Sequence, residues 1–239
     1  MHDSGVRVMD RMKTLLVAIC HPQAQELVSI TSQTWSKGGA DILCVDHYGK
    51  PPMNWSCPVT YHASIGTDRE ATRFGPVDRT LDVMAWCIQE FLREPPWDYD
   101  QFCFIEPDVV ILREIPSCLD GVGGPCLLGT LAGGQSPPYI AKEYFHCPWV
   151  VPATKLPTLF GRGGRLVELG LGENGWTDRW LGLIAALYPE LEMYDSGNYS
   201  QNALDQPRFI AEAREAMKRP DCFAIHGVKS KAQFDALML

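Results

Sequence analysis

The stretch Gln101-Phe102-Cys103-Phe104-Ile105-Glu106-Pro107-Asp108-Val109-Val110-Ile111 decides the fold. It is an apolar run that ends abruptly in two carboxylates and then resumes as a second apolar run. A run of Phe, Cys and Ile this short indicates an interior strand of a sheet that is covered on both faces. The two acids then lie at the carboxyl end of that strand, where open α/β sheets bind their ligands. An acidic turn between two strands is the alternative interpretation.

Two acids beside so much apolar surface are costly unless a positive charge neutralises them. A divalent cation that carries phosphates would do so, because Mg²⁺ and Mn²⁺ take oxygen ligands and need only one or two carboxylates beside phosphate oxygens. Glu106 and Asp108 are therefore candidate metal ligands.

The elements around this stretch follow the order expected of an α/β protein. Buried strands are expected over residues 14–20, 40–46, 101–105, 127–130, 149–151 and 222–225. Helices are expected over 23–37, 76–93, 157–171 (with a glycine interruption), 178–187 and 208–217. The first strands and helix form a βαβ unit, and loops are expected over 47–72, 130–150 and 188–207. We expect a single α/β domain spanning residues 1–239, with a mixed, mostly parallel central sheet flanked by helices.

Composition excludes several classes of protein. A net charge of −8 and a pI of about 5.2 argue against strong non-specific binding of nucleic acid. The nine cysteines are scattered and include no CxxC pair, which indicates buried reduced thiols and not a zinc ribbon. Reduced thiols, the lack of an apolar stretch long enough to cross a bilayer and a polar N-terminal segment predict a protein of the cytoplasm, away from membranes.

The sequence also lacks the phosphate-binding loops of dinucleotide and P-loop proteins. There is no GxGxxG and no GxxxxGK[ST]. A GxSxG nucleophile elbow, typical of α/β-hydrolases, is missing as well. The glycine-rich segment 160–165 does not follow a strand in the way that a Rossmann turn does, and a loop is the simpler interpretation.

An acid-ended central strand followed by a final strand that ends in His226-Gly227-Val228-Lys229-Ser230 resembles the GT-A class of nucleotide-sugar glycosyltransferases. Glu106-Pro107-Asp108 stands where that family carries its DxD-type motif, with Glu in place of the first Asp. The resemblance implies that Asp108 is the main metal ligand and Glu106 an auxiliary one, that His226 completes the metal site, and that Lys229 meets the diphosphate. It implies Mn²⁺ or Mg²⁺ as cofactor, and imidazole suits Mn²⁺ better. A surface histidine at a strand end is the alternative for His226.

The same resemblance divides the chain into a nucleotide-sugar-binding half, residues 1–125, and an acceptor-binding half, residues 126–239, with the metal-site segment at its end. The strand-one exit, with Ala18, Cys20 and His21, would meet the base and ribose. Asp46, at the second strand exit, would accept hydrogen bonds from them; ordinary turn chemistry for an Asp that closes a strand is the favoured alternative. Arg79 would reach sugar or phosphate, and its alternative is a surface ion pair.

The segment Glu173-Asn174-Gly175-Trp176-Thr177-Asp178-Arg179-Trp180 corresponds in place to the acidic acceptor-side motif of the family. The resemblance implies Asp178 as the general base and Glu173 as the second choice, because a base must reach the acceptor hydroxyl. Trp176 would stack on the acceptor. The competing explanation has Thr177 or Asp178 as a helix N-cap and the two tryptophans as core anchors.

Together these observations predict a metal-dependent glycosyltransferase that uses a nucleotide sugar of the UDP type and a hydroxyl acceptor. The chain is similar to small phage-type transferases that modify hydroxymethylated pyrimidines in DNA, which would place it in a host cytoplasm. Arg162 and Arg165 would then hold acceptor phosphates, with the base extruded from its stack. The alternatives are a small-molecule or protein hydroxyl as acceptor, a non-catalytic nucleotide-sugar-binding protein, and a nucleotidyltransferase.

Overall fold

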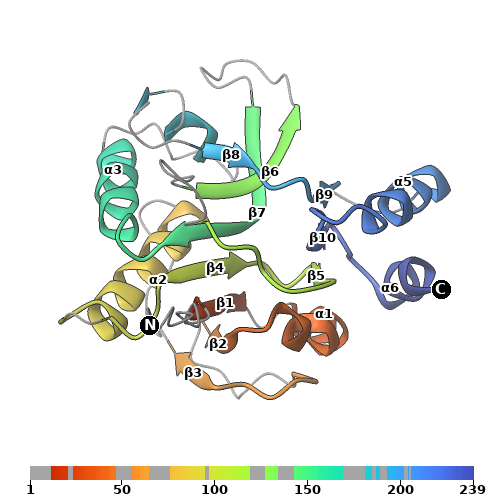
Figure 1. The fold of residues 1–239 in the computed structure, drawn as a ribbon, viewed down its shortest axis with the longest axis horizontal. Coiled ribbons are helices and arrows are strands. Elements are labelled where there is room, and N and C mark those ends of the chain that lie inside the picture. Colours follow the sequence, from red (N-terminus) through yellow and green to blue (C-terminus); the bar gives the residue numbers. More distant parts are fainter. Residues whose placement is uncertain are drawn as a thin grey trace, which may run out of the picture.

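A computed structural model describes residues 12–20, 24–46, 55–64, 76–94, 97–118, 127–133, 143–168, 181–184, 187–188, 193–201, 204 and 206–239. Its large sheet has seven strands in the order β3-β2-β1-β4-β7-β6-β8 (Figure 1). Their bounds are β1 Thr14–Cys20, β2 Asp41–Asp46, β3 Tyr61–Ser64, β4 Gln101–Ile105, β6 Leu127–Gly133, β7 Glu143–Pro152 and β8 Met193–Asp195. A small sheet has the order β5-β10-β9, with bounds β5 Val109–Ile111, β10 Ala224–His226 and β9 Tyr199–Ser200.

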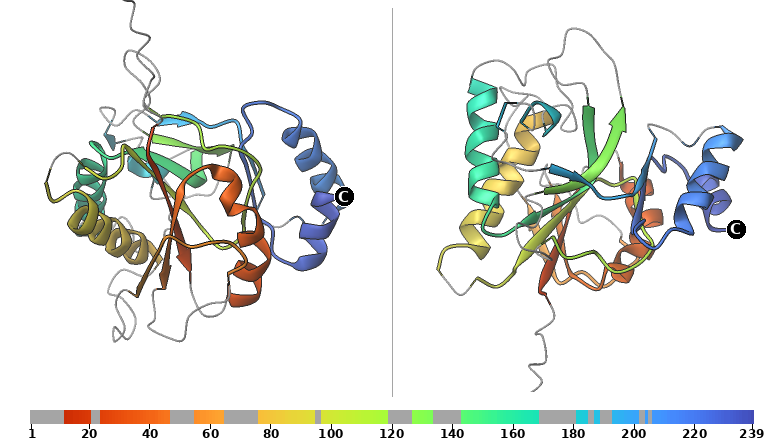
Figure 2. Two further views of the ribbon diagram at one scale, coloured as in Figure 1. Left: turned by 60° about the horizontal axis from the view of Figure 1, so that its bottom comes forward. Right: turned by 45° about the horizontal axis from the view of Figure 1, so that its top comes forward.

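Helices cover both sides of the large sheet. Their bounds are α1 Gln25–Thr31, the 3₁₀ helix η2 Ser32–Gly38, α2 Pro76–Phe91, α3 Leu156–Glu168, α5 Pro207–Met217 and α6 Lys231–Met238. In Figures 1 and 2, α2 and α3 lie together on one side of the sheet, whereas α1, α5 and α6 lie on the other side with the small sheet. The expected α/β class, with a mixed and mostly parallel sheet flanked by helices, is confirmed.

The strand that decides the fold is the central strand of the large sheet. All five residues of β4 are buried. It runs parallel to β1 on one side and antiparallel to β7 on the other. Burial on both faces explains why its sequence is uniformly apolar, without the alternation of a half-exposed strand.

The chain leaves the large sheet directly after β4 and enters the small one. Side chains from α1 and η2 hold the connecting segment in place: the Thr31 hydroxyl donates to the Pro107 carbonyl at 2.6 Å, and the Trp35 indole donates to the Val109 carbonyl at 3.1 Å. The Thr34 hydroxyl accepts from the backbone N–H of Ile111 at 3.0 Å. The Glu106-Pro107-Asp108 turn is therefore fixed against a rigid neighbour and not carried on a free loop.

Three expected loops were partly wrong. Within 47–72 the described residues include β3, which pairs with β2 in parallel. Within 130–150 they include most of the β6–β7 antiparallel pair, and within 188–207 they include β8 and β9. β6 carries glycines and a register irregularity between Leu128 and Thr130 that obscured its periodicity.

The helices also differ from expectation in detail. The glycine-rich segment 160–165 is not a loop, since it lies inside α3. Contact with α2 outweighs the cost of glycine in a helix, which is about 1 kcal/mol per residue. The helix expected over 23–37 tightens into the 3₁₀ helix η2 after Thr31, and α6 was not expected at all.

Two sequence expectations concern the chemical environment. Every cysteine in the part of the chain that the structure describes is a buried thiol outside any disulfide, as expected. No helix among the described residues is long and apolar enough to span a membrane.

Candidate metal centre

The acidic turn after β4 and the histidine at the end of β10 meet at one point. β10 pairs antiparallel with β5 in a register that places His226 opposite Val109. The Asp108 carbonyl accepts from the backbone N–H groups of Gly227 and Val228 at 3.2 and 3.1 Å. Segments more than a hundred residues apart in the sequence are thus joined by the backbone itself, and the predicted meeting of Glu106, Asp108 and His226 is what the structure has.

The imidazole of His226 faces both acids. Its Nε2 lies 3.3 Å from Asp108 Oδ2 and 3.6 Å from Glu106 Oε2. Nevertheless this buried nitrogen makes no hydrogen bond of acceptable geometry within the described residues. Ligand atoms around a tetrahedral zinc-like ion lie roughly 3.3–3.7 Å apart, given metal–ligand distances of about 2.0–2.3 Å. The spacing therefore fits an ion pair and also fits two ligands that share one metal ion.

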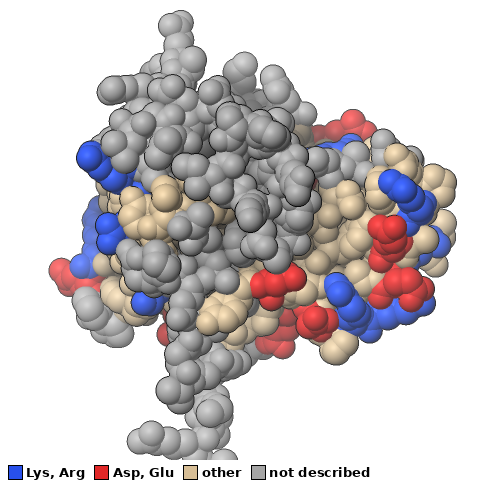
Figure 3. All heavy atoms as spheres, turned by 90° about the horizontal axis from the view of Figure 1, so that it is seen from above, with Lys and Arg blue, Asp and Glu red and all other residues tan. Residues whose placement is uncertain are grey.

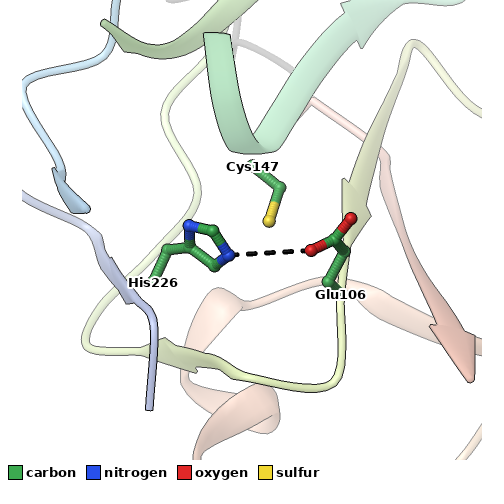
Figure 4. Close-up of side chains that lie close together, drawn as sticks. All are labelled: Glu106, Cys147 and His226. Carbon is green, nitrogen blue, oxygen red and sulfur yellow. Dashed lines mark ion pairs between the residues drawn. The ribbon is translucent and has the colours of Figure 1, made fainter. Parts of the chain in front are cut away.

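A thiol from β7 completes this group. The Cys147 sulfur, a Glu106 carboxylate oxygen and a His226 ring nitrogen all lie within 4.8 Å of one another. Figure 4 shows the three side chains pointing toward a common centre from three different strands or turns. Asp108 is close to His226 but does not belong to this mutually close set.

Asp108 has a cationic partner of its own. The Lys229 ammonium donates to Asp108 Oδ2, and its side chain is still 47 % exposed. The start of α6 holds this lysine in place: Gln233 Oε1 accepts from the Lys229 backbone N–H at 2.6 Å, and Ser230 Oγ accepts from the Gln233 N–H. This reciprocal capping contributes about 1 kcal/mol to the helix. Lys229, which the sequence predicts as the partner of a diphosphate, thus lies half-exposed beside Asp108.

The charges in this cluster support each other. Burial alone would raise the pKa of Asp108, but the positive charges of His226 and Lys229 outweigh burial and hold that pKa well below its usual range. Burial would lower the pKa of His226, and the Asp108 carboxylate reverses this and raises the pKa above its usual value. Without a metal, the centre is a carboxylate held between two cations.

A second histidine and a serine lie behind His226. Ser200 Oγ is 2.8 Å from His226 Nδ1 and 2.6 Å from His146 Nδ1. Burial and the nearby charge of His226 lower the pKa of His146 to about 4, so His146 is neutral. The serine hydroxyl bridges the Nδ1 atoms of the two histidines. This chain leaves His226 Nε2 as the atom that faces the acids.

Other predicted residues lie elsewhere. Ala18 and Cys20 are buried in β1, beside β4, and their side chains are 1 % exposed, so a nucleotide there would contact backbone. Arg162 and Arg165 are on α3, across the large sheet from β10 (Figures 1 and 2), and the Arg162 guanidinium lies 4.7 Å from the Tyr188 ring centre. The structure does not bring these arginines to the metal centre.

The remaining predicted residues cannot be placed at the centre. His21, Glu173, Trp176 and Asp178 lie outside the described residues. Asp46 ends β2 and Arg79 lies in α2, but only their backbone is described.

Sequence reasoning missed His146, Cys147 and Ser200. His146-Cys147-Pro148 was assigned to a loop because β7 was expected to start at Trp149, whereas it starts at Glu143. A cysteine in an apolar strand has the pattern of a small core residue. The sequence does contain one indication of a metal site here: His146 and Cys147 are adjacent, and both are residue types that bind metal ions.

On the face that Figure 3 shows, the described charged residues are distributed unevenly. Figure 3 shows mainly Lys and Arg on the α2–α3 side of the visible face and a mixture of acids and bases on the α5–α6 side.

Comparison of the sequence with models of known protein families gave no match, and comparison with curated proteins gave none either.

Proposed function

We propose that the protein is a metal-dependent glycosyltransferase that moves a sugar from a nucleotide sugar of the UDP type to a hydroxyl acceptor. One observation carries this proposal: the buried His226 Nε2, at the C-terminal end of the fold, lies 3.3 and 3.6 Å from the two acids that end the central strand and makes no hydrogen bond there among the described residues. The resemblance to the GT-A class implies that this histidine and the two acids lie together at one metal site, which is why their proximity supports the proposal.

The chain offers groups for both the cation and the diphosphate. Glu106 and His226 would hold the divalent ion, with Asp108 joining them when Lys229 leaves it. Mn²⁺ is expected ahead of Mg²⁺ because one ligand is imidazole. Such an ion would neutralise charge on the nucleoside diphosphate as it departs.

The exposure of these residues indicates the direction from which a donor approaches. Asp108 and His226 are more than nine-tenths buried, whereas the side chains of Glu106 and Lys229 are 41 and 47 % exposed. The donor phosphates would therefore enter on the Glu106–Lys229 side, where Lys229 would donate to a phosphate oxygen. The carboxyl end of β1, next to that of β4, is the corresponding place for the base and ribose.

The acceptor part of the proposal rests on the sequence. Asp178, with Glu173 as second choice, would take the proton of the acceptor hydroxyl, and Trp176 would stack on the acceptor. A hydroxymethylated pyrimidine in DNA stays a candidate acceptor through the resemblance alone, since Arg162 and Arg165 lie across the sheet from His226. The buried thiols support a reducing cytoplasm as the place of action.

Incubation with UDP-glucose and Mn²⁺ tests the proposal. We expect slow release of UDP by hydrolysis, because water replaces the acceptor, and loss of that release when the metal is chelated. Tight binding of UDP-glucose without turnover would favour a nucleotide-sugar-binding protein. Pyrophosphate release from a nucleoside triphosphate and a sugar phosphate would favour a nucleotidyltransferase.

Replacement of Lys229 by Met tests the diphosphate contact. We expect UDP to bind roughly 10- to 100-fold more weakly in the presence of Mn²⁺, because a charge-assisted hydrogen bond is worth about 1.5–3 kcal/mol. Titration calorimetry measures this affinity. Lys231→Met is the matched control: Lys231 is two residues further on and pairs with Asp235 at 2.7 Å on the exposed side of α6. Equal affinities in both variants would remove Lys229 from the site.

A further inference from the structure

We infer that Cys147 is a metal ligand and that the centre therefore takes Zn²⁺, or Co²⁺ in its place, in strong preference to Mg²⁺. The inference rests on the same site as the proposed function, with which it shares Glu106 and His226, and it replaces the Mn²⁺ expected there with Zn²⁺ as the preferred ion. It does not depend on sugar transfer, because it concerns only what the metal-free protein binds.

The first support is the ligand set. Cys147, Glu106 and His226 provide one sulfur, one oxygen and one nitrogen within 4.8 Å of one another. Three protein ligands that leave a further position for water or substrate are typical of catalytic zinc sites. Thiolate ligands select Zn²⁺ over the hard ions Mg²⁺ and Mn²⁺, which prefer oxygen. Mg²⁺ binds oxygen ligands, so a thiol is not expected in the ligand set of a site that is specific for Mg²⁺.

The second support is the unsatisfied nitrogen of His226. A buried polar atom without a hydrogen bond is costly, about 1–3 kcal/mol, and needs an explanation. Among the described residues His226 Nε2 is such an atom: it lies at ion-pair distance from Glu106 and Asp108 but has no hydrogen-bond partner. It points into the space that the Glu106 carboxylate and the Cys147 thiol also face (Figure 4). A cation bound by all three would satisfy it.

The third support is the pair of residues behind His226. Metal-binding histidines almost always donate their second ring N–H to a neighbouring acceptor, which fixes the tautomer and the ring orientation. His226 Nδ1 has Ser200 Oγ at 2.8 Å, and Ser200 is in turn held by His146 at 2.6 Å. This chain occupies Nδ1 and leaves Nε2 facing the metal position.

Binding has a simple proton balance. The Cys147 thiol loses its proton as the sulfur–metal bond forms, and His226 Nε2 loses any proton that it carries; both protons go to solvent. No oxidant or reductant is needed. Glu106 binds as the carboxylate.

Titration of the metal-free protein with Co²⁺ tests the inference without any nucleotide sugar. We expect a near-ultraviolet sulfur-to-cobalt charge-transfer band at one equivalent, which one equivalent of Zn²⁺ abolishes and a large excess of Mg²⁺ leaves unchanged. Cys147→Ser should lose the band. Cys44→Ser, which replaces an equally buried thiol on β2, should keep it. A wild-type spectrum without the band, or a Cys147→Ser spectrum that retains it, would overturn the assignment.

A second measurement needs no substitution and so remains valid if Cys147→Ser fails to fold. X-ray absorption of the wild-type zinc complex should show one sulfur neighbour at about 2.3 Å among lighter ligands. A shell of nitrogen and oxygen alone would refute the inference while leaving the Asp108, Glu106 and His226 centre of the proposed function intact. Conversely, absence of sugar transfer would not change either spectrum.

Discussion

Asp108→Asn is expected to reduce sugar release from UDP-glucose by roughly 10³-fold or more. The carboxylate would help to hold the divalent ion that stabilises the charge on the departing diphosphate, and the amide of asparagine would not. Asparagine keeps the shape of the side chain. It also keeps the backbone carbonyl that accepts from Gly227 and Val228, so the joint between the acidic turn and β10 is retained. UDP release at saturating Mn²⁺ measures the effect, and circular dichroism checks the fold.

The control for this substitution is Asp98→Asn. Asp98 is exposed and precedes the amino end of β4, at the opposite end of the strand from Asp108. The Asp98→Asn variant should retain wild-type turnover. If Asp108→Asn were as active as Asp98→Asn, the carboxylate that the DxD-like motif supplies would have no part in the reaction.

Gly227→Ala is expected to cost on the order of 4 kcal/mol of folding stability, among the largest effects of a single substitution. Gly227 has a φ of 102°, in the region that favours glycine. A Cβ built there would lie 1.7 Å from the backbone oxygen of Gln201, which has no flexible side chain to move aside. Because Gly227 follows His226 directly, the distortion would also displace the imidazole from the acids. Urea denaturation measures the stability, and cobalt titration measures the site.

Gly161→Ala provides the opposite result as a control. Gly161 lies in α3 with nothing within 4 Å of its Cβ position. Alanine there should stabilise the protein by roughly 0.5–1 kcal/mol, because glycine in a helix loses more conformational freedom on folding. A Gly227→Ala protein as stable as the wild type would mean that the turn after β10 differs from the one described here.

The local sequence was sufficient to predict the strand at the centre of the sheet and its acid-tipped end. β4 is short, uniformly apolar and followed by two carboxylates, so its burial and its ligand-bearing edge follow from composition alone. The meeting of Asp108 with His226 was predicted only through the resemblance in the order of elements. No local pattern encodes the β5–β10 pairing, which joins residues about 115 positions apart.

The missed features depend on tertiary contacts that the sequence pattern does not reveal. Cys147 has the composition of a core strand, and only the antiparallel pairing of β7 with β4 brings it to the end of the central strand. The helix through Gly161 and Gly164 forms because α3 packs on α2, against the intrinsic preference of glycine. The missed helix α6, in contrast, could have been predicted from the sequence. Ser230 and Gln233, three residues apart, form a capping pair that marks the start of a helix, and the hydrophobic pattern alone does not show it.

The ion pair between Lys229 and Asp108 has a thermodynamic consequence for the order of ligand binding. The Lys229 ammonium competes with an incoming divalent ion for the same Asp108 carboxylate oxygen. In the absence of a nucleotide, this competition lowers the affinity of the protein for the ion. A diphosphate gives the lysine another anion to contact and thereby frees Asp108 for the metal. Ion and nucleotide should each raise the affinity of the protein for the other by one and the same factor, since linkage between two sites is reciprocal.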